Sequence, residues 1–344
     1  MIDASVLVVG GGAIGGVTAG LMTGHVRRVA VLDANREHVS LLRDPGLRLD
    51  ELGAERLVPL EAYRSVAELD GSFDFGLITL KAQNLEAALP EIVERDLVDV
   101  FVGLGNGLVQ DRVAALVGRE RLVAGIVEWG ATNLAPGHLS QTTRNVFVVG
   151  ELDGAARERT DRLARVLGTV AETRVSTNIR GQIWSKLLVN SAFSGLGVVG
   201  GVLYRDVAAH AAGRRALCAL WSEGHRVGLA EGLELEPVLG IPADALVIAG
   251  DGPQVGRDSV RIEGALETAL ALAGATKASM LQDVERGALT EVDVINGAVV
   301  ERAAAHGLPA PLNARVVELV HQFERGERAP STDLYEGLAA LAGS

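Results

Sequence analysis

Two short segments of the chain, about a hundred residues apart, place ionisable and amide side chains inside otherwise apolar sequence. The first runs from Trp184 to Asn190 and contains Lys186, and the second runs from Ser279 to Gly297 and contains Glu291. Burying such groups costs several kcal/mol unless they pair with one another or serve a ligand. The four-residue spacing of Lys186 and Asn190 predicts that they share one face of a helix.

The sequence around Glu291 suggests a partner for Lys186. Thr290-Glu-Val-Asp293 resembles a capping box with Thr290 as the N-cap, so we expect Glu291 in the first helical turn, where the helix dipole keeps a carboxylate ionised. An ionised Glu291 close to Lys186 would hold the lysine as an ammonium group. An ammonium group is the proton donor that reduction of a carbonyl needs. The alternative is an ordinary structural role, in which Lys186 extends to solvent and Asn190 ends a turn.

Composition excludes several classes of function. The formal net charge of −12 argues against a nucleic-acid partner, although local Lys and Arg could still bind a small anion. A single cysteine, Cys218, allows no disulfide within the chain and no thiolate metal cluster, and the histidines show no metal-ligand spacing. No signal peptide and no apolar run of about 20 residues is present, so we expect a cytoplasmic protein without a membrane partner.

The pattern of elements predicts an α/β fold with two domains. Buried strands at 6–9, 29–32, 75–80 and 98–104 alternate with helical segments, which is typical of a Rossmann-type doubly wound parallel sheet over residues 1–178. Segments 138–142 and 146–150 suggest an antiparallel hairpin on that sheet. Residues 179–344 predict an all-helical C-terminal domain, interrupted by a Pro- and Gly-rich loop at 237–256. The helices expected there are 181–194, 206–231, 262–286, 291–306 and 312–325.

A glycine-rich loop follows the first strand. Gly10-x-Gly12-x-x-Gly15 connects that strand to a helix, which is the context that the dinucleotide fingerprint requires. The first glycine permits the tight turn, the second the approach of the pyrophosphate and the third close packing of helix on strand. We therefore expect the loop, with Ala13 and Ile14 in the first helical turn, to bind a nicotinamide dinucleotide; an ordinary glycine turn is the alternative.

Three further polar residues stand where strands end. Asp33 lies 18 residues past Gly15, where a carboxylate accepts from the ribose hydroxyl and repels a 2′-phosphate, which favours NAD(H) over NADP(H). Arg36 could instead hold a 2′-phosphate. Lys81 and Asn106 follow the third and fourth strands, at the sheet edge where ligands bind in open α/β sheets. Each could also be a turn residue.

These motifs together resemble the ketopantoate reductase (2-dehydropantoate 2-reductase) family over nearly the whole chain. The segments that carry the resemblance are the glycine loop, Leu80-Lys81-Ala82, Asn106-Gly107, Ile179-Arg-Gly-Gln-Ile-Trp-Ser-Lys186, Asn190, Ser279-Met-Leu-Gln-Asp283, Thr290-Glu-Val-Asp-Val-Ile-Asn-Gly297 and Ala305-His-Gly307.

The resemblance implies a Rossmann domain, a helical domain that often dimerises, and NADPH-dependent formation of pantoate for pantothenate biosynthesis. It also implies residue roles. Lys186 would be the general acid, Glu291 its partner and a contact for a substrate hydroxyl. Substrate would be bound by Asn106, Asn190 and Ser279, and Lys81 and Asn106 would contact the cofactor.

Three departures from the family pattern leave the substrate and cofactor open. Asp33-Ala34 stands where the family commonly has an arginine, Ser194 replaces a frequent second asparagine in the substrate-binding set, and 93 residues separate Lys186 from Ser279. Our first hypothesis is an NAD(P)H-dependent reductase of a 2-oxo acid, most simply ketopantoate. The second is an NAD-dependent dehydrogenase of another 2-hydroxy acid, such as one of the mandelate type. The third is a non-catalytic NAD(H)-sensing protein, which the intact Lys186, Asn190 and Glu291 argue against.

Overall fold

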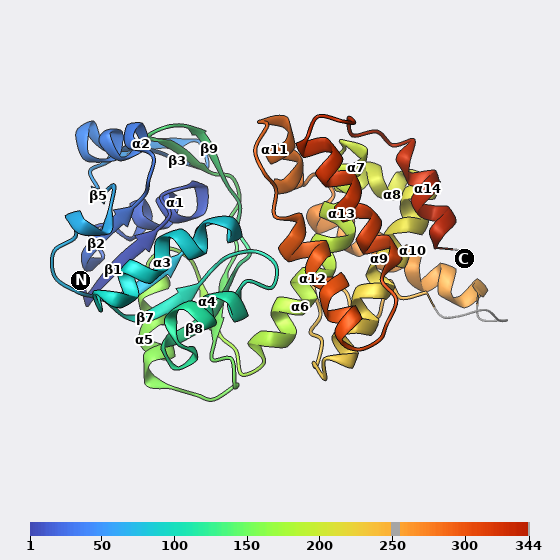
Figure 1. The fold of residues 1–344 in the computed structure, drawn as a ribbon, viewed down its shortest axis with the longest axis horizontal. Coiled ribbons are helices and arrows are strands. Elements are labelled where there is room, and N and C mark those ends of the chain that lie inside the picture. Colours follow the sequence, from blue (N-terminus) through green and yellow to red (C-terminus); the bar gives the residue numbers. More distant parts are fainter. Residues whose placement is uncertain (249–254, 343–344) are drawn as a thin grey trace. The chain divides into compact units, whose positions relative to one another are not determined.

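The computed structural model describes residues 1–248 and 255–342, and contacts divide the chain into two compact units (Figure 1). Unit 1 comprises Met1–Gly105 and Val109–Ile179, and unit 2 comprises Asn106–Leu108 and Arg180–Ser344. The three residues 106–108 therefore pack with the helical part of the chain, whereas the sequence pattern assigned them to the first domain. That 1–178 is a dinucleotide-binding domain and 179–344 a helical substrate and catalytic domain stays a prediction.

Unit 1 is built on a mixed sheet of eight strands in the order β12-β11-β8-β7-β6-β1-β2-β5. The six strands from β8 to β5 run parallel, and β11 joins the edge antiparallel to β8. Buried Val- and Leu-rich runs form the central strands because helices cover both faces of a parallel sheet. The strands are β1 (Ile2–Val9), β2 (Val26–Leu32), β5 (Glu61–Tyr63), β6 (Phe73–Ile78), β7 (Val98–Gly103), β8 (Leu122–Val127), β11 (Phe147–Gly150) and β12 (Thr173–Val175).

Helices alternate with these strands, which confirms the predicted α/β fold with a doubly wound parallel sheet. In α3, Leu85, Leu89 and Ile92 recur at helical spacing and are buried, while the opposite face is exposed. The α-helices of unit 1 are α1 (Ala13–Met22), α2 (Arg36–Leu41), α3 (Leu85–Glu94), α4 (Gln110–Val117) and α5 (Glu158–Leu167). Shorter helical turns are η1 (Leu42–Gly46), η2 (Val66–Glu68), η3 (Ala82–Asn84) and η4 (Arg119–Arg121).

The predicted hairpin of 138–142 with 146–150 is wrong, because the two segments belong to different sheets. β10 (His138–Gln141) pairs with β9 (Ala131–Ala135) and β3 (Leu47–Glu51) in a second sheet completed by β4 (Ala54–Val58), whereas β11 pairs with β8 and β12. The tight turn lies on the other side of β10, at Pro136-Gly137, where Gly137 has a φ of 70°. In a type II turn, proline supplies the fixed negative φ of the first central residue and glycine the positive φ of the second. The polar segment 143–145, which links the two segments of the predicted hairpin, contains neither residue.

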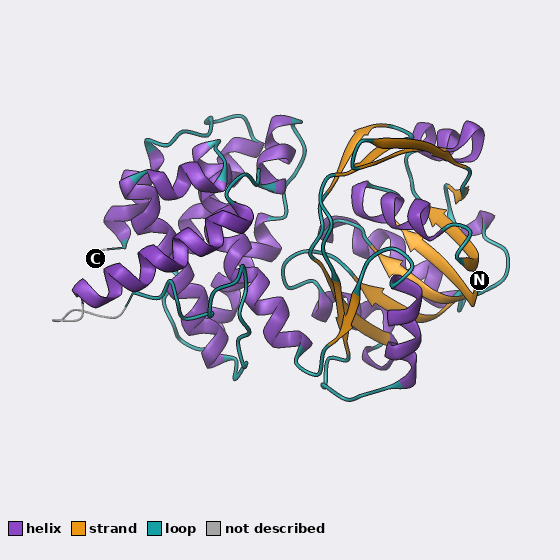
Figure 2. Cartoon of the chain, turned by 180° about the vertical axis from the view of Figure 1, so that it is seen from behind, coloured by secondary structure: helices purple, strands orange, loops and turns teal. Residues whose placement is uncertain are grey.

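The described part of unit 2 consists of helices joined by loops and contains no named strand, as the sequence predicted (Figure 2). Its first helix continues without interruption through a π-helical segment, η5, into α7. The elements are α6 (Ile179–Val189), η5 (Asn190–Ser194), α7 (Gly195–Gly200), α8 (Tyr204–Ala209), α9 (Ala211–Ala230), α10 (Val255–Ala273), α11 (Ser279–Glu285), α12 (Val292–Ala305), α13 (Pro311–Glu324) and α14 (Leu334–Leu341).

Two helix predictions need correction, and one helix was missed. The expected helix 206–231 breaks at His210, whose Nδ1 accepts from the Gly213 N–H and caps α9. The expected helix 262–286 is two helices, because α10 ends at Ala273 and α11 begins at Ser279. In the linker, the carbonyls of Gly274 and Thr276 accept from the first N–H groups of α8, so tertiary contacts stabilise the break. The helix α14 was not predicted.

The predicted Pro- and Gly-rich loop at 237–256 is partly described. Residues 237–248 form a loop with an isolated bridge between Val238 and Ile241, and residues 249–254 lie outside the described part of the chain. Residues 255 and 256 already belong to α10, which begins seven residues before the predicted start at 262.

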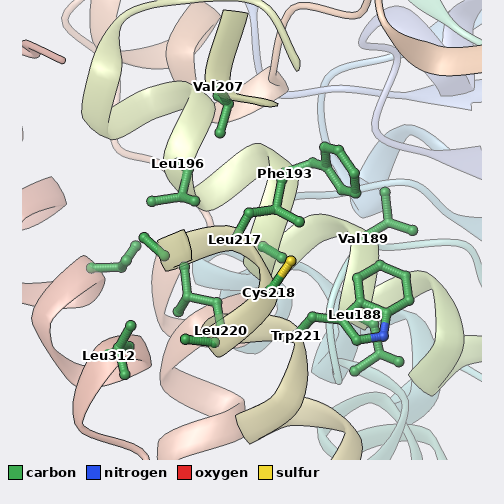
Figure 3. Packing of buried hydrophobic residues seen from close by; sticks show 14 of the residues in the cluster. Leu188, Val189, Phe193, Leu196, Val207, Leu217, Cys218, Leu220, Trp221 and Leu312 are labelled. Carbon is green, nitrogen blue, oxygen red and sulfur yellow. The ribbon is translucent and has the colours of Figure 1, made fainter. Parts of the chain in front are cut away.

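The core of unit 2 packs α6, η5 and α7 against α9 (Figure 3). Phe193 meets Trp221 edge to face with ring centroids 6.4 Å apart, and the Trp221 indole N–H donates to the Ala243 carbonyl at 2.7 Å. Burial raises the pKa of the Cys218 thiol to about 11, so this thiol stays protonated, as expected of a structural cysteine. Fully burying each large apolar side chain here contributes about 1.5–3 kcal/mol.

Candidate active site

The glycine loop of unit 1 has the backbone geometry that a dinucleotide requires. Gly10 has a φ of 103°, which fits the tight turn between β1 and α1. A Cβ on Gly15 would lie 2.0 Å from the Gly10 carbonyl oxygen, so helix and strand pack this closely only with glycine there. A Cβ on Gly12 would meet nothing described within 4 Å, so a phosphate can approach this backbone from outside.

The start of α1 offers backbone donors to an anion. Gly12 is the N-cap, and among the described residues no side chain caps the helix. Ala13, Ile14 and Gly15 form the first turn, where N–H groups have no partner within the helix and the dipole favours negative charge. These residues fit the pyrophosphate of a nicotinamide dinucleotide. Their contact with the cofactor stays a prediction.

Asp33 lies beside this loop. Its Oδ2 accepts from the Gly11 N–H and its Oδ1 from the Asn35 N–H, both at 2.8 Å. Each carboxylate oxygen has a second lone pair, so Asp33 can still accept from a ribose hydroxyl. Arg36 is exposed on the first residue of α2. The geometry is compatible with the predicted ribose contact and gives Asp33 an additional role in holding the loop.

His38 is a loop-supporting residue that the sequence reasoning missed. Its side chain is 3% exposed, and its Nδ1 accepts from the Gly137 N–H at 2.9 Å. Nε2 therefore carries the proton and donates to the Gly11 carbonyl at 2.7 Å. Asp33 and His38 thus hold the N–H and the C=O of the same glycine. The sequence signal for this role was a histidine on the buried face of α2, three residues after the N-cap Asn35.

Lys81 lies three residues beyond the end of β6, which is the neighbour of β1 in the sheet. Its side chain is half-buried. It therefore stands at the carboxyl edge of the parallel strands, where the sequence predicted it, and its cofactor contact stays a prediction.

In unit 2, Asn106 connects the two ionisable residues on which the sequence argument rests. The Lys186 ammonium donates to Asn106 Oδ1, and Asn106 Nδ2 donates to Glu291 Oε2, each at 3.3 Å. All three side chains are half-buried. The sequence predicted a lysine held by Glu291, and the structure adds an amide that contacts both groups. An amide is suited to this place because it offers one acceptor and one donor.

The backbone after Asn106 is fastened to the first turn of α12. Leu108 N–H donates to the Val294 carbonyl at 3.0 Å, and Gly107 has a φ of 68°. A Cβ on Gly107 would lie 2.0 Å from that same carbonyl oxygen, so any other residue would push Asn106 away from α12. Glycine is therefore required here both for conformation and for space.

The predicted capping box at Thr290 is wrong. The N-cap of α12 is Glu291, one residue later, and the Glu291 side chain makes no cap hydrogen bond. Thr290 instead donates through both its N–H and its hydroxyl to Glu324 Oε1, at 2.8 and 2.7 Å, while its hydroxyl oxygen accepts from Val292 N–H at 3.2 Å. Glu291 thus flanks the positive end of the helix dipole, with its side chain available to Asn106.

The other three predicted substrate residues are in different situations. Asn190 is half-buried at the start of η5, one turn after Lys186, and Ser279 is exposed at the start of α11. Ser194 is 4% exposed, and its hydroxyl lies 2.5 Å from the Tyr204 hydroxyl inside the core. A substrate contact from Ser194 would require that pair to open. The substrate roles of all three stay predictions.

The described residues contain no group of three or more His, Cys, Asp or Glu side chains that could hold a metal ion. None of the helices described is long and apolar enough to span a bilayer.

Comparisons with known proteins agree with this arrangement. Residues 6–154 match the family model of ketopantoate reductase PanE/ApbA, and residues 178–324 match that of its C-terminal domain. The chain is 28% identical to the 2-dehydropantoate 2-reductase of Mesorhizobium japonicum over 346 residues, covering 93% of this chain and 98% of that protein.

Solved structures show the same fold. A PanE/ApbA family ketopantoate reductase from Ralstonia eutropha JMP134 matches with a TM-score of 0.78 at 23% identity, covering 94% of this chain and 99% of that one. D-mandelate dehydrogenase in a ternary structure with NADH and anilino(oxo)acetate matches with a TM-score of 0.78 at 22% identity and the same coverage. The two family models together span most of the chain, which therefore belongs to the ketopantoate reductase family and is an NAD(P)-dependent oxidoreductase that acts on CH–OH groups.

Proposed function

We propose that the protein reduces the keto group of a 2-oxo acid, with ketopantoate as substrate and pantoate as product, and that Lys186 supplies the proton. The observation that carries this proposal is the hydrogen-bonded series Lys186, Asn106 and Glu291, which includes a lysine that can act as a proton donor. The similarity to named 2-dehydropantoate 2-reductases supports the choice of substrate.

The chemistry divides between a hydride and a proton. The reduced nicotinamide supplies a hydride to the carbonyl carbon when it is bound. The carbonyl oxygen then gains a proton, and the Lys186 ammonium delivers it. Asn106 Oδ1 accepts from Lys186 and orients its N–H bonds. Glu291 holds Asn106 in the required rotamer and keeps negative charge near the lysine, so that Lys186 is protonated before the reaction.

Substrate binding in this proposal uses the polar groups around the lysine. Asn190 lies one helical turn from Lys186 and can donate to the carboxylate of a 2-oxo acid. Ser279 can do the same from the start of α11, and Glu291 can accept from a substrate hydroxyl. A substrate without that hydroxyl would leave a half-buried carboxylate less well satisfied, which would favour ketopantoate over simple 2-oxo acids.

The cofactor preference that we propose is for NAD(H). Asp33 carries a negative charge beside the loop and lies within 2.8 Å of Gly11 N, so a 2′-phosphate would be repelled there. This observation also favours a second candidate function, the NAD-dependent oxidation of another 2-hydroxy acid. D-mandelate dehydrogenase, solved with NADH, shares the fold. A non-catalytic NAD(H) sensor is disfavoured because Lys186, Asn106 and Glu291 form a complete hydrogen-bonded set.

The deciding experiment measures oxidation of NADH and of NADPH, by loss of reduced-nicotinamide absorbance, with ketopantoate and a set of aliphatic and aromatic 2-oxo acids. Turnover that is fastest with ketopantoate supports the first candidate. Turnover confined to an aromatic acid such as phenylglyoxylate, with mandelate oxidised in reverse, supports the second. Tight NADH binding without turnover of any acid would refute both and leave the sensor.

Cytoplasmic location and a homodimer formed through the helical unit remain predictions. Size-exclusion chromatography with light scattering would test the homodimer.

A further inference from the structure

A chain of buried polar side chains in unit 2 ends beside the proposed catalytic helix. Asn296 on α12 is fully buried, and its Nδ2 donates to two acceptors, the Ser191 carbonyl at 3.0 Å and Asn313 Oδ1 at 2.9 Å. Ser191 directly follows Asn190 in η5, and Asn296 follows Glu291 by five residues. One buried amide therefore joins the helix of Lys186 and Asn190 to the helix of Glu291.

The orientation of these amides is determined by Glu223, which is 3% exposed on α9. Its carboxylate accepts from the N–H groups of Leu312 and Asn313 in the first turn of α13, at 2.9 and 3.0 Å, and from Asn313 Nδ2 at 2.8 Å. Burial raises the pKa of Glu223, and these three donors oppose that rise. Because Asn313 Nδ2 faces the carboxylate, its Oδ1 must face Asn296, and Asn296 must present its Nδ2 to Ser191.

The π-helical segment is the second observation. The Gly195 N–H donates to the carbonyls of Ala192 and Asn190, three and five residues back, and not to the Ser191 carbonyl that it would use in an α-helix. Asn296 Nδ2 donates to this Ser191 carbonyl. A Cβ on Gly195 would lie 3.2 Å from both Asn296 Nδ2 and Oδ1, so the glycine makes room for the amide.

The π segment also contains Ser194, whose hydroxyl lies 2.5 Å from the Tyr204 hydroxyl inside the core. Lys186 and Asn190 are half-buried, whereas Ser194 is 4% exposed. The segment therefore connects the half-buried Lys186 and Asn190 to residues that pack in the core.

We propose that Asn296 is a positioning residue, which holds the π segment and thereby fixes Lys186 and Asn190 relative to Glu291. This inference rests on the proposed function for the roles of those three residues. Asn296 itself is fully buried and acts through the Ser191 carbonyl. One structural observation indicates a functional constraint: Asn296 Oδ1 is buried and has no hydrogen-bond partner among the described residues, an unfavourable arrangement that an apolar residue would avoid.

The test compares Asn296→Leu with Tyr335→Phe. Leucine has a similar size and removes both donors. Tyr335 is fully buried, and its hydroxyl donates a hydrogen bond to the Leu196 carbonyl at 2.9 Å. Leu196 lies five residues after Ser191 in the same continuous helix. Tyr335→Phe therefore removes one buried side-chain hydrogen bond to that helix, as Asn296→Leu does. With the best substrate, we expect kcat of Asn296→Leu to fall about tenfold or more, with the Kd for NADH within about twofold of wild type. Tyr335→Phe should keep kcat while losing a similar amount of thermal stability.

A readout independent of turnover is hydrogen exchange at residues 190–195. Asn296→Leu should change the protection of the Gly195 amide, because the Ser191 carbonyl becomes available for an α-helical bond, and Tyr335→Phe should leave it unchanged. A folded Asn296→Leu with normal kcat would overturn the positioning role. Unchanged hydrogen exchange at the Gly195 amide would overturn the link between Asn296 and the π segment. This readout does not depend on turnover, so it would still apply if the wild-type protein reduced none of the acids tested and the proposed function had failed.

Discussion

Replacing Asn106 by aspartate probes the Lys186, Asn106 and Glu291 series with almost no change of shape. The amide lies 3.3 Å from both Lys186 Nζ and Glu291 Oε2. Aspartate retains the acceptor that faces the lysine. It replaces the donor that faces Glu291 by an oxygen that shares a negative charge.

The electrostatic effect follows from these distances. Two unit charges 3.3 Å apart interact by about 1.3 kcal/mol in water and by about 5 kcal/mol at an effective dielectric constant of about 20. The side chains are half-buried, so the water-like value is the lower limit. The added carboxylate favours the ammonium form of Lys186, and even about 1.3 kcal/mol corresponds to about one pH unit. Lys186 then gives up its proton less readily, so reduction should slow, and the alkaline decline of activity should begin at higher pH.

The assay is the pH profile of kcat for reduction of the best 2-oxo acid, with a thermal melt of each variant. The matched control is Asn133→Asp, which adds the same charge at an exposed position on β9. We expect the alkaline midpoint to rise by about one pH unit or more for Asn106→Asp and to stay constant for the control. An unchanged profile in a folded Asn106→Asp, or equal shifts in both variants, would refute the arrangement.

Three further outcomes are expected. Lys186→Ala should lower turnover about 10²-fold or more with NADH binding nearly unchanged; full turnover measured in the same assay would exclude Lys186 as the general acid. Asp33→Ala should move the ratio of kcat/KM for NADH and NADPH toward NADPH, and an unchanged ratio would mean that Asp33 does not face the ribose. Burial favours a higher pKa for Asp74, but hydrogen bonds from Ser5 and an ion pair with Arg162 outweigh it and lower the pKa from 3.8 to about 2. Because this pKa is depressed, the stabilisation is present above about pH 4 and is lost as pH falls toward 2. Asp74→Asn should therefore lower the free energy of unfolding by about 1–2 kcal/mol at neutral pH, after allowance for partial solvent screening. The fall in the free energy of unfolding between about pH 4 and pH 2, measured by urea denaturation, should become shallower. An unaltered fall would contradict the assignment of the depressed pKa to Asp74.

Local patterns in the sequence were sufficient for much of the fold. The alternation of buried strands with helices led to the parallel sheet of unit 1, and Gly10, Gly12 and Gly15 occupy the positions that their spacing predicted. Helical periodicity likewise indicated an all-helical second part. These features depend on backbone conformation and on which face of an element is apolar, and both are encoded in neighbouring residues.

Pairing and termination of elements were less accessible. The segments 138–142 and 146–150 each have strand character, but β propensity does not specify a partner, and they joined different sheets. In the linker between α10 and α11, two backbone carbonyls accept hydrogen bonds from the first N–H groups of α8. The break therefore depends on a helix that lies some seventy residues earlier in the chain.

The candidate site shows the same division. Lys186, Asn190 and Glu291 were found from sequence because a polar group in an apolar segment is conspicuous wherever it occurs. The sequence could not show that Asn106 contacts both Lys186 and Glu291. Lys186 is 80 positions and Glu291 is 185 positions away from Asn106 along the chain. The same holds for His38 at the glycine loop and for Asn296 at Ser191. Residue types and local spacing thus specified which chemical groups are present, whereas long-range packing decided which of them are in contact, because a hydrogen bond depends on distances that only the folded chain establishes.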